Sequence, residues 1–310
     1  MIADLPLRLA ASCLTLAAAL HPATGRCQTP PIVAVPAALA PAGVQMEHIS
    51  VVTIGKGSPV ILIPGLSSPR ETWAGVTPEL ARHHRVHLVQ VNGFGGDDPR
   101  ANLSPGVLDG VVADLHAFIS RERIAGAAVV GHSLGGLLAL KLAAAHPGDA
   151  GRVMIVDALP FYGMLFGPGM TPAVIEPRAA MMRDAMKAGY GKPADPARSQ
   201  ALVNAMALKP SSRALVLGWT GKADARVGAQ AMYEDLTTDV TADLPRIAVP
   251  LTLVVPYNDT LPQAQVDALY RGAYKGLPHL TVVEVPDAAH FVMLDQPEAF
   301  ARALAAFLAG

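Results

Sequence analysis

The chain has 310 residues, of which 51% are hydrophobic and 16% charged, and its net charge at pH 7 is −1. This apolar content excludes an intrinsically disordered protein and is sufficient for one large core. The balanced charge, without a run of Lys or Arg, gives no electrostatic footprint for nucleic acid, so no nucleic-acid partner is expected.

Residues 1–25 are typical of a secretory signal peptide. The apolar run at residues 9–20 is too short to span a bilayer, and Ala23 and Gly25 supply the small residues of a cleavage site. Cleavage after Gly25 predicts a periplasmic or secreted protein with no stable membrane insertion. The alternative is an N-terminus that is retained.

Residues 26–43 are rich in Pro and Ala, and this composition predicts a linker. The sequence has two cysteines, Cys13 and Cys27, of which signal cleavage would leave one. No intramolecular disulfide is therefore expected. Export without disulfides fits a bacterial envelope protein whose core is large enough without them.

Short apolar stretches alternate with helical patterns in the rest of the chain. Strands are predicted at residues 48–57, 59–65, 85–93, 127–131, 152–158, 250–256 and 280–286, and helices at 108–121, 134–145, 263–274 and 297–308. Asp295, with Glu298 three residues on, is the predicted N-cap of the last helix. Most strands are apolar on both faces, as parallel strands covered by helices are. The alternation predicts an α/β fold with a doubly wound, mostly parallel sheet, formed by residues 44–159 and 244–310.

Residues 160–243 interrupt this alternation because they contain no convincing buried strand. The segment has helical stretches punctuated by Gly and Pro, and it holds seven of the eleven Met residues. Met side chains adapt to irregular apolar surfaces. The pattern predicts a helical cap inserted between two strands of the sheet.

Ser133 lies in the sequence GHSLG, between a predicted strand and a predicted helix. This context matches the G-x-S-x-G turn that presents a nucleophilic serine. A side chain at Gly131 or Gly135 would collide with neighbouring backbone in so tight a turn. The N-terminus of the following helix would also direct N–H groups and a positive dipole at the site.

A serine nucleophile needs a base, and the base needs a carboxylate that orients it. His290 follows the last predicted strand, in a loop at the same sheet edge as Ser133. Asp259 follows the preceding strand, and the chain order Ser133, Asp259, His290 is the order expected for this architecture. Asp157, at the end of an earlier strand on the same edge, is the alternative acid.

Two backbone N–H groups, those of Leu66 and Leu134, are predicted to form an oxyanion hole. Leu66 is in the loop after the strand at residues 59–65, and Leu134 directly follows the nucleophile. The cluster His83, His84 and His87 does not present one metal-binding helical face, because His87 lies in a predicted strand. Neither a metal nor a cofactor is expected.

With these motifs in order along the chain, the sequence resembles the α/β-hydrolase superfamily in its single-domain form with a helical cap. The resemblance covers most of residues 48–308 and rests on GHSLGG, ILIPG, VNGFGG, LVVPYND and AAHFVMLDQPEAF. Three positions depart from the family pattern: Pro64 replaces a frequent His, Asn92 a frequent Asp, and Pro256 the Gly that usually ends the strand before the acid. Ser133 argues against the family's epoxide hydrolases and haloalkane dehalogenases, which attack with an Asp.

The resemblance and the candidate triad predict a serine hydrolase that cleaves small-molecule carboxylic esters with short-to-medium acyl chains. Ser133 would attack the acyl carbon, His290 would carry the proton, and Asp259 would orient the imidazole. Alternatives on the same fold are carbon–carbon bond hydrolysis, acyl transfer and perhydrolysis. From a different class, the chain could be a non-catalytic binding protein on a hydrolase scaffold.

Overall fold

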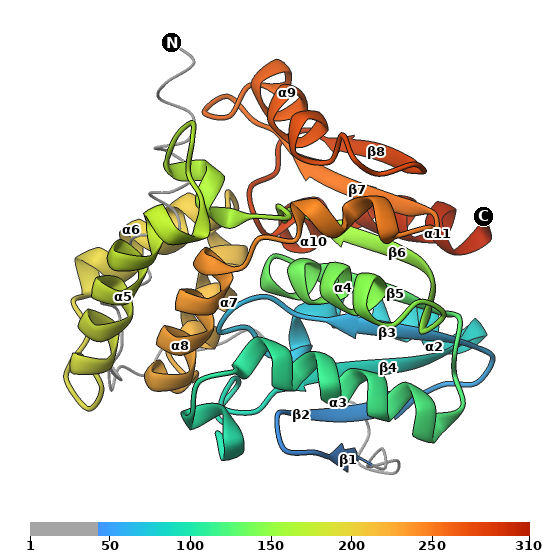
Figure 1. Cartoon of the computed structure of the whole chain (residues 1–310), viewed down its shortest axis with the longest axis horizontal. Coiled ribbons are helices and arrows are strands. Elements are labelled where there is room, and N and C mark those ends of the chain that lie inside the picture. Colours follow the sequence, from blue (N-terminus) through green and yellow to red (C-terminus); the bar gives the residue numbers. More distant parts are fainter. Residues whose placement is uncertain (1–42) are drawn as a thin grey trace.

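The computed structural model describes residues 43–310, so the predicted signal peptide and nearly all of the predicted linker lie outside the described residues. Figure 1 shows a central sheet with helices on both of its faces. In the described part of the chain the sheet has eight strands in the order β1-β2-β4-β3-β5-β6-β7-β8. Their bounds are β1 Gly43–Gln45, β2 Ile49–Ile54, β3 Ser58–Ile63, β4 His84–Val91, β5 Ala127–His132, β6 Ala150–Val156, β7 Leu251–Pro256 and β8 Leu280–Val285.

The sheet is parallel from β4 to β8, and β2 pairs antiparallel with both β1 and β4. The predicted α/β fold with a doubly wound, mostly parallel sheet is therefore confirmed. Strand side chains alternate between faces. In β3, Ile61 and Ile63 belong to one apolar core, whereas Val60 and Leu62 belong to the other. This is why the strand sequence is apolar throughout.

Helices contribute apolar side chains to each of the two cores. The first core receives them from α3 (Val107–Glu122), α4 (Leu134–Ala145) and α9 (Gln263–Ala273). The second receives them from α2 (Thr77–His83), α10 (Val292–Asp295) and α11 (Pro297–Ala309). Two short 3₁₀ helices, η2 (Arg70–Trp73) and η3 (Arg100–Leu103), complete this part of the chain. Helix α4 is buried along most of its length, as its apolar sequence predicts.

Between β6 and β7 the chain forms a group of helices that lies at one end of the sheet (Figure 1). They are η4 Tyr162–Phe166, α5 Pro172–Ala188, α6 Pro196–Met206, α7 Pro210–Thr220, α8 Ala225–Thr237 and η5 Thr241–Arg246. We call this group the cap. One contact that joins it to the core is Glu234 of α8, whose carboxylate accepts hydrogen bonds from three N–H groups at the start of α3, with N···O distances of 2.7, 3.2 and 2.8 Å.

The sheet has an edge strand, β1, that was not predicted from the sequence, because the first predicted strand begins at residue 48. Gly43, the last residue of the predicted linker, is the first residue of β1, which pairs with β2. The fully buried Asn92 side chain secures the connection between these strands, because its Nδ2 donates to the carbonyl oxygens of Met46 and Glu47 at 2.9 and 3.0 Å. Among residues 43–310, no helix is both long and apolar enough to cross a membrane.

Candidate active site

Ser133 occupies a strained turn between β5 and α4. Its backbone has φ 54° and ψ −125°, in the positive-φ region that non-glycine residues rarely adopt. A Cβ at Gly131 would lie 2.1 Å from the Gly135 carbonyl oxygen, and one at Gly135 would lie 2.3 Å from the Ile63 carbonyl oxygen. Both glycines are therefore required sterically. The turn places Ser133 at the carboxyl end of β5.

His290 lies in the loop between β8 and α10, and its imidazole is paired with a carboxylate. The Nδ1 atom is 2.6 Å from Asp157 Oδ2. Both side chains are mostly shielded from water, with exposed fractions of 13% and 6%. Burial of this kind strengthens a hydrogen bond between an imidazole and a carboxylate. The pair can hold the His290 ring in one orientation and one tautomer.

The prediction that Asp259 is the partner of His290 is therefore not what the structure shows. Asp259 is exposed at the tip of a tight turn that runs from Asn258 to Leu261. The adjacent Asn258 takes the inward position, since its Nδ2 donates to the Ala288 carbonyl oxygen at 2.8 Å. Asp157, the alternative acid, holds the position beside the imidazole.

Asp157 has a second partner that the sequence did not indicate. The Tyr270 hydroxyl of α9 donates to Asp157 Oδ1, so both carboxylate oxygens are engaged. One turn later on the chain, the Tyr274 hydroxyl donates to the Ala158 carbonyl oxygen at 2.8 Å. Burial, aided by the nearby Asp157 carboxylate, holds the pKa of Tyr274 well above its usual value. Tyr274 therefore remains a neutral donor that fixes the backbone after Asp157.

Ser133 and His290 line the same small, largely enclosed cavity beneath the cap. The loop after β3 forms one wall, the cap another and the His290 loop a third. The lining residues are Gly65, Leu66, Ser68, His132, Ser133, Tyr162, Met206, Met232, Asp235, Leu236, His290 and Phe291. Most of this lining is apolar, which suits a small organic substrate.

Of the two residues predicted to supply oxyanion donors, one lines this cavity and the other is adjacent in sequence to a residue that lines it. Leu66 lines it directly, and Leu134 is the first residue of α4, immediately after Ser133. Neither backbone N–H donates a hydrogen bond to another residue within the described chain. The approach of the Leu66 loop depends on Gly65, where a Cβ would lie 2.9 Å from His132 Nδ1 and 3.0 Å from Ser133 Cβ. Pro64 is compatible with this arrangement because a backbone N–H, rather than a side chain, is required.

His132, the variable residue of the GHSLG sequence, supports the His290 loop. Its Nε2 lies 2.9 Å from the His290 carbonyl oxygen, so this nitrogen carries the proton. The ring also packs against His290 and Phe291. Complete burial, and secondarily His290, lowers the pKa of His132 well below its usual value. A neutral His132 can therefore support the loop without adding a charge beside His290.

The prediction that Asp295 is the N-cap of the last helix is wrong. Gln296 holds that position, and the fully buried Asp295 carboxylate instead accepts hydrogen bonds from three backbone N–H groups. These belong to Leu208 and Lys209 in the cap and to Ala289 beside His290, with distances of 2.9, 3.2 and 3.1 Å. One carboxylate thus joins the cap to the His290 loop.

Asp235 is a further residue of the cavity, and it was not predicted from the sequence. Its side chain is buried on α8, and its Oδ1 has no hydrogen-bond partner among the described residues. Burial raises the pKa of Asp235 to about 7. A usable signal exists in the sequence: Asp235 falls on the same helical face as Ala231 and Met232, which marks it as a buried acid.

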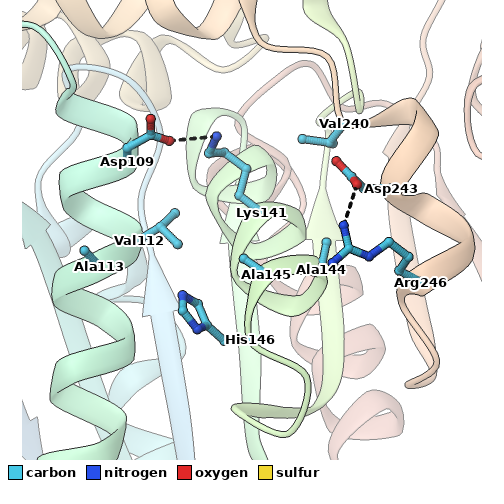
Figure 2. Close-up of a pocket in the computed structure, with 10 residues that line it drawn as sticks. All are labelled: Asp109, Val112, Ala113, Lys141, Ala144, Ala145, His146, Val240, Asp243 and Arg246. Atoms are coloured by element: carbon cyan, nitrogen blue, oxygen red, sulfur yellow. Dashed lines mark hydrogen bonds and ion pairs between the residues drawn. The ribbon is translucent and has the colours of Figure 1, made fainter.

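A second hollow, shown in Figure 2, lies between α3, α4 and η5. Its charged side chains are paired, with Lys141 Nζ 3.0 Å from Asp109 Oδ1 and Arg246 Nη1 3.0 Å from Asp243 Oδ1. None of its lining residues belongs to the Ser133 cavity. The hollow is therefore separate from the candidate active site.

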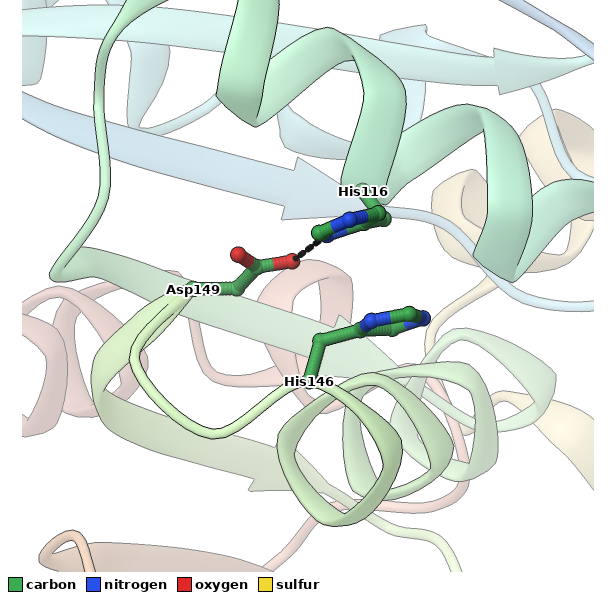
Figure 3. A group of neighbouring side chains, drawn as sticks. All are labelled: His116, His146 and Asp149. Carbon is green, nitrogen blue, oxygen red and sulfur yellow. Dashed lines mark hydrogen bonds and ion pairs between the residues drawn. The ribbon is translucent and has the colours of Figure 1, made fainter.

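His116, His146 and Asp149 form the one three-residue group in the described chain whose atoms lie close enough to hold a metal ion (Figure 3). His116 Nδ1 is 2.8 Å from Asp149 Oδ2, whereas the two imidazoles stack with centroids 3.9 Å apart and planes 10° apart. An imidazole binds a metal in the plane of its ring. Two parallel stacked rings cannot both direct an in-plane lone pair at one point between them, so this arrangement favours stacking over metal coordination.

His83, His84 and His87, which are close in sequence, do not form a metal-binding group in the described structure. His84 Nδ1 is 2.7 Å from Ser58 Oγ, and His87 Nδ1 is 2.9 Å from Thr53 Oγ1. Burial, with a smaller contribution from Arg85, lowers the pKa of His87 to about 4. His84 and His87 thus have separate partners on neighbouring strands.

Comparison with known proteins gives relatives with several activities. The chain is 26% identical to a pimeloyl-[acyl-carrier protein] methyl ester esterase from Edwardsiella ictaluri, over 83% of this chain and 96% of that protein. It is 29% identical to the polyketide synthase ThaQ of Burkholderia thailandensis, over 82% of this chain, and 32% identical over 41% of this chain to the corresponding esterase of Aeromonas hydrophila. The chain spans only 12% of the synthase and 48% of the Aeromonas esterase.

Solved structures share the fold at low sequence identity. An enol-lactonase from Burkholderia xenovorans superposes with a TM-score of 0.67 at 20% identity, covering 84% of this chain and 96% of the other. A thermophilic esterase from Thermogutta terrifontis gives a TM-score of 0.69 at 20% identity, covering 86% and 98%. The model of the alpha/beta hydrolase family matches residues 60–303, a span that includes the Ser133 turn, the cap and the His290 loop. The chain belongs to the α/β-hydrolase family.

Proposed function

We propose that this protein is a serine hydrolase that cleaves carboxylic esters through an acyl-enzyme on Ser133. The observation that carries this proposal is the paired His290 and Asp157, at a distance of 2.6 Å, in the cavity that Ser133 also lines. A serine becomes an effective nucleophile when such an oriented base stands beside it. The esterases among the relatives are consistent with this chemistry.

In the proposed reaction, His290 takes the Ser133 hydroxyl proton as Oγ attacks the acyl carbon. The carbonyl π electrons move to oxygen, where the Leu66 and Leu134 N–H groups stabilise the negative charge. The carbon–oxygen bond to the alcohol then breaks, and the imidazolium returns the proton to the leaving alcohol. Water repeats the sequence on the acyl-enzyme, which releases the carboxylic acid and restores Ser133.

Asp157 has two tasks in this scheme. Its Oδ2 fixes His290 with Nδ1 protonated, which leaves Nε2 as the base, and its negative charge stabilises the imidazolium that forms. The Tyr270 hydroxyl on Oδ1 keeps the carboxylate from turning away. The catalytic triad proposed here is therefore Ser133, His290 and Asp157.

The cavity favours esters with short-to-medium acyl chains. Met206, Met232 and Leu236 give the cap side of the cavity an apolar and adaptable wall. A buried methylene contributes about 0.8 kcal/mol, so each carbon that fits should raise kcat/KM a few-fold until the small cavity is filled. Long-chain triglycerides should be poor substrates.

A fluorophosphonate probe tests the proposal directly, because it forms a stable adduct with an activated serine. We expect one adduct, on Ser133, and loss of both the adduct and esterase activity in Ser133→Ala with an unchanged circular dichroism spectrum. An unlabelled wild-type protein would support a non-catalytic binding protein instead. The values of kcat/KM on nitrophenyl esters from acetate to laurate would then give the dependence on acyl chain length. Equal values across the series would show that the cavity does not select the acyl chain.

A further inference from the structure

Asp235 is a buried acid in the wall of the catalytic cavity, and one of its carboxyl oxygens has no hydrogen-bond partner among the described residues. Its residue exposure is 6%, and its Oδ1 atom accepts no hydrogen bond from any described residue. The other cap residues that line the cavity, apart from Tyr162, are Met206, Met232 and Leu236. The cap side of the cavity thus combines three apolar side chains with the Tyr162 phenol and a single carboxyl group. A few polar groups in a mostly apolar lining are the arrangement by which binding sites fix the orientation of a ligand.

An unpartnered buried carboxyl is unusual because desolvation without a hydrogen bond is costly. The two other buried acids of the site are fully engaged: Asp295 accepts from three backbone N–H groups, and Asp157 from His290 and Tyr270. A carboxyl retained only for stability would be expected to have such partners as well. The missing partner of Asp235 is therefore expected to come from a molecule in the cavity.

The chemistry of the cavity restricts that molecule. No Lys or Arg is among the lining residues, so a negatively charged group would face Asp235 without a counter-charge. Burial keeps Asp235 partly neutral near pH 7, which weakens its attraction for an ammonium group. A hydroxyl can donate to the ionised carboxyl and accept from the neutral one, so it matches both forms.

Building on the proposed ester hydrolysis, we propose that Asp235 is a specificity-determining residue that hydrogen bonds a hydroxyl group on the acyl chain, so that the preferred substrates are hydroxyacyl esters. The acyl side is assigned because Asp235 shares α8 with Met232 and Leu236, the residues that form the proposed acyl wall. The rest of the acyl chain would remain in apolar contact.

The test compares 4-nitrophenyl 3-hydroxybutyrate with 4-nitrophenyl butyrate, and the matched pair of hexanoyl esters, in wild type and variants. We expect wild type to favour the hydroxyacyl ester of at least one pair by about tenfold or more in kcat/KM, since a site built for a hydroxyl disfavours the analogue that lacks it. Asp235→Leu should invert this preference by improving the plain ester and weakening the hydroxylated one. Asp235→Asn, which keeps the shape and hydrogen-bonding capacity, should retain part of the preference.

Met232→Leu is the packing control: it changes the same wall without its polar group, and the ratio between the two esters should stay as in wild type. Equal ratios in wild type and Asp235→Leu, with both proteins labelled on Ser133 by the fluorophosphonate, would overturn the role of Asp235 and leave the proposed function intact. A wild-type preference for the 3-aminobutyryl ester over the hydroxylated one would also overturn it. Absence of both labelling and turnover in wild type would refute the proposed function and this inference together. If Asp235→Leu fails to fold, the wild-type ratio and Asp235→Asn decide the question.

Discussion

Asp157 holds two hydrogen-bond donors, the His290 imidazole on Oδ2 and the Tyr270 hydroxyl on Oδ1. It does so from a backbone with φ 49°, directly after β6. Positive φ is unfavourable for Asp but tolerated when the surrounding structure fixes it. The strain at Ser133 and Asp157 therefore falls on two of the three proposed catalytic residues, where it directs side chains into the site.

Replacing Asp157 with Asn should have a far larger effect on turnover than replacing Asp259 with Asn. The amide cannot both accept from His290 and stabilise an imidazolium, so kcat on nitrophenyl butyrate should fall by about 10³–10⁴-fold. Asp259→Asn is the matched control, because that side chain is exposed and makes no contact with His290. Loss of activity in Asp259→Asn together with wild-type activity in Asp157→Asn would show that Asp259, and not Asp157, is the acid that orients His290.

Two carboxylates, the half-buried Glu234 and the buried Asp295, are among the groups that hold the cap to the core. Glu234 accepts from the first three N–H groups of the α3 region, and Asp295 joins the chain between α6 and α7 to the loop that carries His290. Both contacts use a carboxylate on N–H groups that a helix or loop would otherwise leave unpaired. Glu234 thus positions α8, which lines the cavity, and Asp295 positions the loop that carries the proposed base His290.

Glu234→Ala should destabilise the protein by about 1–3 kcal/mol, since it leaves three N–H groups without their charged acceptor and removes an anion from a helix N-terminus. Urea unfolding at constant slope measures this change. Glu79→Ala is the control because its ion pair with Arg82 lies on the surface, with exposed fractions of 72% and 70%, and should contribute little. Equal midpoints for the two variants would show that Glu234 does not stabilise the cap contact.

The hydrophobic pattern identified the parallel strands, whereas it could not identify which aspartate pairs with His290. A strand such as β3 is apolar throughout because both of its faces are buried, and such an apolar run can be recognised in the sequence. Whether Asp157 or Asp259 meets His290 depends on which turn projects inward, and Asn258 fills the inward position at the second turn. The pairing of the three-residue strand β1 with β2 and the hydrogen bonds of Asp295 likewise depend on contacts between distant residues, which a local sequence pattern does not contain.

Asp235 should make the stability of the whole molecule depend on pH. Its pKa is raised by burial to about 7 from an ordinary value of 3.8, so the folded state binds this proton more tightly than the unfolded state does. The titratable groups that share its cavity are Tyr162, His132 and His290. The sign follows from linkage: stability is greatest below about pH 4 for this group, falls as the pH rises toward 7, and is level above that.

Asp235→Asn removes that dependence, because an amide of the same shape has no proton to lose. The shift in pKa sets an upper bound of about 4 kcal/mol on the difference at pH 8, and entry of water into the cavity will reduce it. We expect a melting temperature about 2–4 °C above wild type at pH 8, corresponding to about 1–2 kcal/mol, and a clearly smaller difference at pH 5. Asp259→Asn, an exposed carboxylate on the same protein, should show no such growth with pH. If the difference in melting temperature between wild type and Asp235→Asn stays constant from pH 5 to 8, Asp235 is solvated or paired in the folded protein. The proposed hydrogen bond between Asp235 and a substrate hydroxyl would then lose its physical basis.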